Sequence, residues 1–373
     1  MRVWLHGSLL VALLTITVAC GGSSTAPGSS TAPSRAPAEA ATPPASAAAP
    51  SSSAGASTAP QTPDKIRVAY NAITADQTPI WLAQDAGIYQ KHGLDVELVS
   101  MQSSAQITPA LMSGELGIAY SAGAGTVAAT LQGADLVMLS SFQPWLRFWL
   151  YTKPEITSVA QLRGTRMGVT RFGGGLHLAG LITVRRAGMD PERDLVMSQL
   201  GGNSEIFTAL MGGAIDSGWV LPPQAYALED AGFRRLVDTL DYRIPYTMSG
   251  ATGSKRYISE HEDIVRRFIR AHMESLALFA SDKELSKRVM AKWTGMDNPE
   301  YLERAYHDSL SSMELIPYTT PDTIQTMLDQ LAEQIPAART ANPEDFIDNR
   351  FVREVVESNP PWLPTTPTAA GAQ

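Results

Sequence analysis

The sequence has little cysteine and no excess of positive charge. Cys20 is the one cysteine among 373 residues, so the chain that follows it can form no disulfide, no thiolate metal site and no cysteine nucleophile. Lysine and arginine (29) are outnumbered by aspartate and glutamate (37), which gives a formal net charge of −8. Nucleic-acid binding needs a basic surface. We therefore expect no nucleic-acid partner.

Patterns that carry catalysis or hold a metal are also absent. The six histidines are scattered, without an HxxxH or HxH pair, so we expect no metal site and no cofactor. No carboxylate pair and no Ser/His/Asp set stands out, which disfavours an enzyme.

The first twenty residues have the pattern of a bacterial signal peptide. Arg2 precedes an apolar stretch, 3–18, which is short for a transmembrane span. The small residue before Cys20 is typical of a lipobox, so we predict that Cys20 is lipidated, although Thr17 stands where a lipobox usually carries leucine. An ordinary cleaved signal with an incidental cysteine is the alternative.

Two segments are too polar and too rich in small residues to fold. Residues 21–63 consist almost entirely of Ser, Ala, Pro, Thr and Gly, and such a segment cannot offset the entropy lost on ordering. We predict that it is a disordered tether and that 364–373 is a disordered tail.

The body between them, 64–363, contains a repeat. Apolar strands at 65–70, 94–100 and 116–122 alternate with helices near 79–86 and 105–114. The same order recurs about 99 residues later, where "ALMGG" (209–213) corresponds to "ALMSG" (110–114). The repeat predicts an α/β fold of two lobes, each a β-α-β-α-β unit. From about 258 onward the pattern is helical.

Alternating strands and helices imply parallel strands, which bind ligands at their carboxyl ends near helix N-termini. Polar and small residues gather in the loops at these ends. In the first lobe the candidate ligand contacts are Asn71, Thr74, Asp76, Gln77, Gln102, Ser103, Ser104, Ser121 and Gly123. In the second lobe they are Arg171, Phe172, Gly173, Gly174, His177, Asn203, Ser204, Trp219 and Gln224.

The glycine loop "VTRFGGGLHLAG" (169–180) invites a phosphate-binding interpretation, which fails on spacing. The dinucleotide pattern from Gly173 needs glycine at Leu178, and the P-loop pattern from Gly175 needs lysine at Leu181. We predict instead that the loop lets a solute approach backbone N–H groups at a helix start.

An aromatic cluster lies between the two repeats, in "SSFQPWLRFWLYT" (140–152). Phe142, Trp145 and Trp149 would suit a flat ring, and Arg147 would suit an attached acid group. Core packing is the alternative for these rings. The cluster favours a small aromatic or heterocyclic solute that could be acidic.

The segment "PIWLAQDAGIYQKHGLDVEL" (79–98), with "ALMSGELGIAYSAG" (110–123) and "ALMGGAIDSGWVLPP" (209–223), resembles the SsuA/THI5-like, or NMT1-like, family of solute-binding proteins of ABC importers. The resemblance implies a type II periplasmic-binding-protein fold. It places the first lobe at 64–162, the second at 163–246 and a return to the first lobe with C-terminal helices at 247–363.

Together with the lipobox-like Cys20, this resemblance leads us to expect a lipid-anchored, extracytoplasmic monomer that binds a small molecule and delivers it to an ABC permease in the membrane. A sensor component with the same ligand-binding fold is an alternative. An enzyme of the thiamine-pyrimidine type is another, but the cysteine-rich motif of those relatives is missing.

Overall fold

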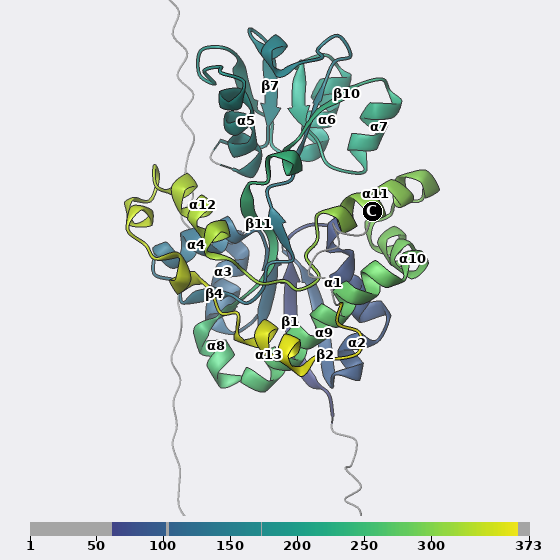
Figure 1. Ribbon diagram of the computed structural model, residues 1–373, viewed down its shortest axis with the longest axis vertical. Helices are drawn as coiled ribbons and strands as arrows, with labels where there is room; N and C mark the ends of the chain where they lie inside the picture. The colour runs from purple at the N-terminus through teal and green to yellow at the C-terminus, as the bar shows by residue number, and fades with distance from the viewer. Residues whose placement is uncertain (1–61, 102–103, 173, 365–373) are drawn as a thin grey trace, which may run out of the picture. The chain divides into compact units, whose positions relative to one another are not determined.

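The computed structural model describes residues 62–101, 104–172 and 174–364, which fall within one compact unit (Figure 1). The expected signal, tether and tail, together with Gln102, Ser103 and Gly173, lie outside the described residues apart from short ends of the tether and tail. Within the described ranges no helix is long and apolar enough to cross a bilayer.

The first lobe is built on a sheet with the strand order β2-β1-β3-β11-β4. β1 pairs in parallel with β2 and β3, whereas β11 runs antiparallel to β3 and β4. A short further strand, β5, pairs with the start of β11. The strands are β1 Asp64–Tyr70, β2 Leu94–Ser100, β3 Ile118–Ser121, β4 Leu136–Met138, β5 Gln143–Trp145 and β11 Pro245–Ser254.

The second lobe is built on a sheet with the order β10-β6-β9-β7-β8. β7 pairs in parallel with β8 and β9, and β6 runs antiparallel to β9 and β10. The strands are β6 Trp149–Thr152, β7 Arg166–Val169, β8 Val196–Gln199, β9 Ser217–Trp219 and β10 Arg234–Asp238.

The two sheets confirm the predicted repeat, down to the register of their strands. Val68 pairs with Ile118 in the first sheet, and 99 residues further on Met167 pairs with Ser217 in the second. Each sheet also receives one antiparallel strand at the same place in its order, β11 in the first and β6 in the second. The chain therefore crosses between the lobes twice.

The crossings shift the expected boundary of the second lobe. Sequence reasoning places 149–152 in the first lobe, yet this segment is β6 of the second sheet, where it pairs with β9 and β10. Pro245, expected at the end of the second lobe, pairs with Trp145 beside the first sheet. Periodicity cannot show this, because a crossing strand has the same apolar pattern in either sheet.

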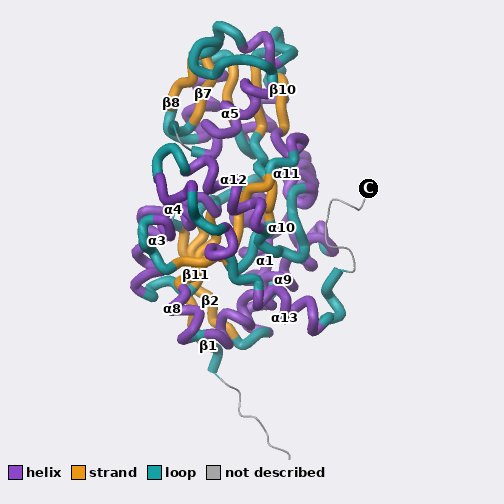
Figure 2. The backbone as a smooth tube through the Cα atoms, turned by 60° about the vertical axis from the view of Figure 1, so that its left-hand side comes forward, coloured by secondary structure: helices purple, strands orange, loops and turns teal. Residues whose placement is uncertain are grey.

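Helices cover both sheets (Figures 1 and 2). The helices that follow the strands are α1 Thr78–Asp85, α2 Ile88–Lys91, α3 Ser104–Ser113, α4 Gly123–Leu131, α5 Gly175–Arg186, α6 Asn203–Met211 and α7 Gln224–Asp230, with 3₁₀ turns η1 Ala75–Gln77, η2 Val159–Leu162 and η3 Thr239–Tyr242. Tightly packed apolar side chains such as Trp81, Tyr120 and Trp219 fill the space beneath them.

The C-terminal helices pack on the first lobe, as expected. α9 and α10 contact α1, α13 contacts α9, and α12 contacts β11 and α4, while α11 lies against α10 and η1. Their bounds are α8 Lys255–Glu260, α9 Glu262–Ser281, α10 Lys283–Thr294, α11 Pro299–Ser311, α12 Pro321–Leu331, η4 Pro336–Arg339, η5 Pro343–Phe346 and α13 Arg350–Ser358.

Candidate functional site

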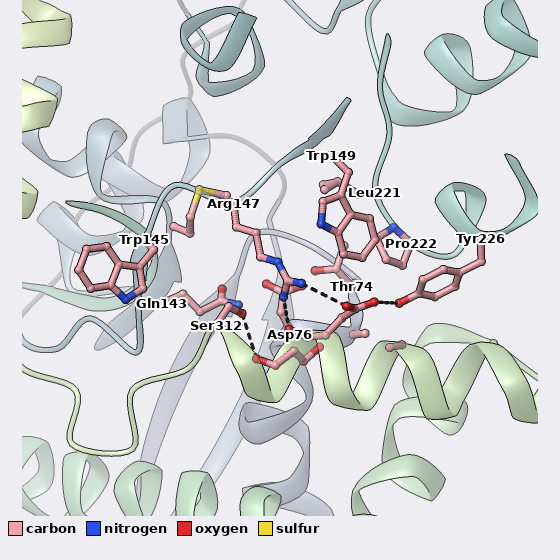
Figure 3. Close-up of a pocket in the computed structure, with 15 residues that line it drawn as sticks. Thr74, Asp76, Gln143, Trp145, Arg147, Trp149, Leu221, Pro222, Tyr226 and Ser312 are labelled. Carbon is pink, nitrogen blue, oxygen red and sulfur yellow. Dashed lines mark hydrogen bonds and ion pairs between the residues drawn. The ribbon is translucent and has the colours of Figure 1, made fainter. Parts of the chain in front are cut away.

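Two hollows receive side chains from both lobes. The first, here called the aromatic pocket, has a volume of about 90 Å³ and is drawn in Figure 3. It is lined by Thr74, Ala75, Asp76, Gln143, Trp145, Arg147, Trp149, Leu221, Pro222, Tyr226, Met248, Ala305, Asp308, Ser309 and Ser312. The second, here called the wide cleft, measures about 800 Å³ and lies among the strand ends at Asn71, Ala122, Thr170 and Gly201.

The aromatic pocket draws its walls from four parts of the fold. Thr74 and Asp76 follow β1 of the first lobe, and Tyr226 lies on α7 of the second. The crossing segment, from Gln143 to Trp149, supplies the two indole rings and Arg147. α11 closes the remaining side with Asp308 and its neighbours (Figure 3). Any molecule held here would touch both lobes.

Arg147 is paired with carboxylates of the protein itself. Its Nη2 lies 3.2 Å from Asp308 Oδ1 and 3.6 Å from Asp238 Oδ2, and its Nη1 donates to the carbonyl oxygen of Asp308. The side chain is only 14% exposed. The residue lines the pocket as expected, but its charge is already balanced, which weakens the argument that it receives an acidic group of the ligand.

The two tryptophans differ in how much of each ring is free. The Trp149 indole donates to Asp238 Oδ2 at 2.7 Å, and the guanidinium carbons of Arg147 and Arg235 lie 5.1 and 4.7 Å from its ring centroid. Trp149 is buried, whereas Trp145 is partly exposed. Trp145 is therefore the ring with more surface available to a solute.

Tyr226 joins the second lobe to α11. Its hydroxyl donates to Asp308 Oδ2 at 2.7 Å, and the Arg304 guanidinium carbon lies 4.2 Å from its ring centroid. Burial, together with the Asp308 carboxylate, raises the pKa of the Tyr226 hydroxyl well above its usual range. Arg304 also pairs with Glu229 of α7. Polar contacts thus connect α7 with α11 beside the pocket.

Two polar side chains of the pocket lack strong partners. Asp76 accepts a 3.3 Å hydrogen bond from Gln77 Nε2 but forms no ion pair with any residue that the structure describes. Gln143 is 6% exposed, and within the described ranges its side-chain amide forms no hydrogen bond. Because this amide lines the pocket, a ligand held there could bond to it.

The glycine loop lies at the wide cleft. Arg171 and Gly174 line it, and Gly174 is the N-cap of α5, so the loop lies at a helix start as expected. The Phe172 ring is 55% exposed and meets the His177 ring edge-to-face at 5.2 Å. Burial, followed by the charge of Arg185, lowers the pKa of His177.

Some candidate residues serve the structure around the hollows and line neither of them. Phe142 is fully buried against Tyr120 and His272, and Trp219 is fully buried near Gly180. Trp219 is the last residue of β9 and Phe142 directly precedes β5, and both side chains belong to the core. For these two rings the core-packing alternative describes the structure.

Several polar candidates form hydrogen bonds that stabilise the loops. Asn203 Oδ1 accepts from the Leu221 N–H at 2.7 Å, and its amide donates to Gln224 Oε1, which fixes the turn before α7. Gln77 is buried and donates to Ser249 Oγ at 3.0 Å. Ser121, buried in β3, Gly123, which packs against Met327 at the start of α4, and Ser204, near Gln224, also line neither hollow. The same is true of the neighbouring rings of Phe172 and His177. Ser104 begins α3.

Several pocket residues were missed from the sequence. Asp308 belongs to a C-terminal helix with an ordinary amphipathic pattern, and nothing in its neighbourhood signals a site. Tyr226 lies two residues after the candidate Gln224, in the same first turn of α7, and a lone tyrosine there carries no signal of a site. Gln143 lies inside the aromatic cluster, where the neighbouring rings are the stronger signal and a single amide side chain does not indicate a site.

Among the residues that the structure describes, no group of three or more His, Cys, Asp or Glu side chains could hold a metal ion.

Comparison with known proteins identifies related folds and one related sequence. The profile of the family described as NMT1/THI5 like matches residues 74–284. YtlA of Bacillus subtilis (strain 168), itself a predicted binding protein, is 22% identical over 308 residues, which cover 76% of this chain and 89% of that protein.

Solved structures of periplasmic binding proteins share the fold. The aliphatic sulphonate binding protein SsuA of Escherichia coli is 20% identical, with a TM-score of 0.63 over 76% of this chain and 99% of its own. The nitrate-binding protein NrtA of Synechocystis PCC 6803 is 13% identical, with a TM-score of 0.64 over 82% of this chain and 92% of its own.

Proposed function

Since the chain belongs to the NMT1/THI5-like family, whose profile matches more than half of its residues, we propose that it is a solute-binding protein of an ABC importer. It captures a small molecule between its two lobes and presents it to a permease in the membrane. The names of SsuA and NrtA, which share the fold, support a periplasmic binding role.

The observation that carries the proposal is the composition of the aromatic pocket. Asp76 comes from the first lobe, Tyr226 from the second, and Trp145 and Trp149 from the segment that crosses between them. A ligand that contacts all of these is bound best when the lobes are closed. Closure around a ligand by hinge motion is the movement that such a two-crossing architecture permits.

The protein acts outside the cytoplasm, held at the membrane by a lipid on Cys20. The signal pattern before Cys20 and the polar tether after it support this part of the proposal. A long polar tether would let the lobes reach a permease while the anchor stays in the bilayer. We further propose that the protein is a monomer and not an enzyme, in line with the binding roles named for SsuA and NrtA.

The lining of the pocket favours a solute that contacts aromatic faces. Indole rings bind planar groups by stacking and cations through their π-faces, whereas nitrate needs neither. We therefore propose the aromatic or heterocyclic solute that the sequence predicts. The charged side chains that line the pocket determine whether a positive or a negative solute binds.

Capture of a solute is tested on the purified, full-length folded chain. Native mass spectrometry should detect a co-purified small molecule, and extract from the growth medium should raise Tm, because a ligand at 100 times its Kd adds about 2.7 kcal/mol to stability. Absence of both a bound molecule and any stabilisation by extract would refute the proposed function.

A further inference from the structure

We infer that the aromatic pocket recognises the positive group of an organic cation: an ammonium, amidinium or guanidinium. This inference rests on the proposed function, because it names the class of solute that the same site would bind. It is carried by four features of the pocket: its balance of charge, its unpaired amide, its rings and its size.

The charged side chains that line the pocket sum to a negative value; the guanidinium groups of Arg235, Arg243 and Arg304 lie against its rings from outside this lining. Asp76, Asp308 and Arg147 line it, and Asp238 contacts Arg147 from outside the lining. Asp308 and Asp238 share the single positive charge of Arg147, while Asp76 has no cationic partner among the described residues. A carboxylate in a partly closed site favours a positive group, and a second anion would be repelled.

The Gln143 amide adds a second hydrogen-bonding side chain to the lining of the pocket. It is more than nine-tenths buried and lines the pocket, and no described residue bonds to its side chain. Its carbonyl oxygen can accept a hydrogen bond from an ammonium, amidinium or guanidinium N–H. Asp76 and Gln143 would then supply two acceptors for one cation.

The rings of the pocket already bind cations within the protein. The guanidinium groups of Arg147 and Arg235 lie against Trp149, and that of Arg243 lies 5.6 Å from the centroid of Trp145. The Arg304 guanidinium lies against the ring of Tyr226 in the same way. Aromatic walls with nearby carboxylates are the arrangement that binds organic cations.

The volume limits the size of the group. A cavity of about 150 Å³ binds benzene, whereas the aromatic pocket measures about 90 Å³. It accommodates a group of a few heavy atoms, such as guanidinium or methylammonium, with the rest of the solute outside it. The positive group is thus the part that this pocket selects.

An anion is the competing occupant. Arg147 Nε is buried without an acceptor among the residues that the structure describes and could donate to an anion. The rest of its guanidinium is already held by Asp308 and Asp238, so a bound anion would have to displace them or lie beside Asp76. The charge balance therefore favours the cation.

The test uses three planar probes of nearly the same shape but different charge: the cation guanidinium, the neutral molecule urea and the anion nitrate. Methylammonium and methanesulfonate form a second pair. Isothermal titration at millimolar concentration with the full chain should show binding of guanidinium or methylammonium at least tenfold tighter than urea, with no heat from nitrate or methanesulfonate.

Asp76→Asn tests the residue assigned to the cation. It should weaken cation binding at least tenfold without lowering Tm, whereas Asp95→Asn, at an exposed carboxylate of β2, should leave affinity unchanged. Binding of nitrate or methanesulfonate in preference to the cations would overturn the inference. An equal loss of cation affinity in both variants, or no cation binding at all, would overturn it too. Failure of the proposed function is distinguishable, since it is judged by extract-dependent stabilisation and co-purified solute of any charge.

Discussion

The Tyr226 hydroxyl donates a 2.7 Å hydrogen bond to the Asp308 carboxylate and so joins α7 of the second lobe to α11, which packs on the first. The same carboxylate pairs with Arg147 of the crossing segment. One side chain therefore links three parts of the chain that would move relative to one another when the lobes open. This link is the structural basis for coupling closure to what occupies the pocket.

Removal of the Tyr226 hydroxyl should favour the open form. A hydrogen bond to a charged group contributes about 1.5–3 kcal/mol, so Tyr226→Phe should increase the open population of the ligand-free protein tenfold or more. Small-angle X-ray scattering should show a larger radius of gyration. Tyr242→Phe is the control, since its ring contacts Arg186 within the second lobe. An unchanged radius in Tyr226→Phe would mean that this contact does not hold the lobes.

Acid should destabilise the protein through His272. This ring is fully buried in the first lobe without a partner on either nitrogen among the described residues, and burial lowers its pKa to about 3. In the unfolded chain the pKa is about 6.5. Between these values only the unfolded state binds the proton, so stability falls as pH decreases from about 6.5 to about 3.

The His272→Phe variant tests this dependence. At pH 4.5 the histidine should lower the free energy of unfolding by about 2–3 kcal/mol relative to neutral pH. Urea unfolding at a series of pH values should show that the variant lacks this part of the decrease. Tyr120 and Phe142 surround the site with aromatic rings that accept a phenyl group. The exposed His261→Gln should keep the parental slope; a parental slope in His272→Phe would contradict the account.

The crossing strand β11 should tolerate no side chain at Gly250. A Cβ there would lie 2.2 Å from the carbonyl oxygen of Ser140, a backbone atom that cannot move aside. Gly250→Ala should lower the free energy of unfolding by about 3 kcal/mol. At Gly123 a Cβ meets the flexible end of Met327, so Gly123→Ala should change stability by less than about 1 kcal/mol. Similar unfolding midpoints for the two variants would contradict this prediction, because they would show that β11 has room for a Cβ at Gly250.

Membrane attachment should depend on Cys20. Because the proposed lipid is attached to this thiol, Cys20→Ala should move the protein from the membrane fraction to the soluble extracytoplasmic fraction. Fractionation followed by immunoblotting measures the change, and Ser23→Ala serves as the control. A variant that remains with the membrane would exclude the lipid anchor.

The fold was predictable because its main elements carry local signals. The repeat at a spacing of 99 predicted equivalent strands, and Val68–Ile118 and Met167–Ser217 confirm even their register. The crossing strand 149–152 could not be assigned to the second sheet, since pairing of Trp149 with Asp238 depends on contacts between distant segments.

The site was predictable only in part. Trp145, Arg147 and Trp149 line the aromatic pocket as their clustering indicated, but the same clustering included Phe142, which is in the core. Asp308 joins Arg147 across 161 residues, and no local pattern reveals such a partner. The charge of a site depends on these distant partners, and for this reason Arg147 alone suggested an acidic ligand.

A crystal structure of the full chain with its co-purified or extract-derived solute tests the central claim most directly. We predict closed lobes and ligand density in the aromatic pocket, in contact with Trp145, Tyr226 and Asp76. Density confined to the wide cleft beside Arg171 and Gly174, with the aromatic pocket filled only by water, would contradict it.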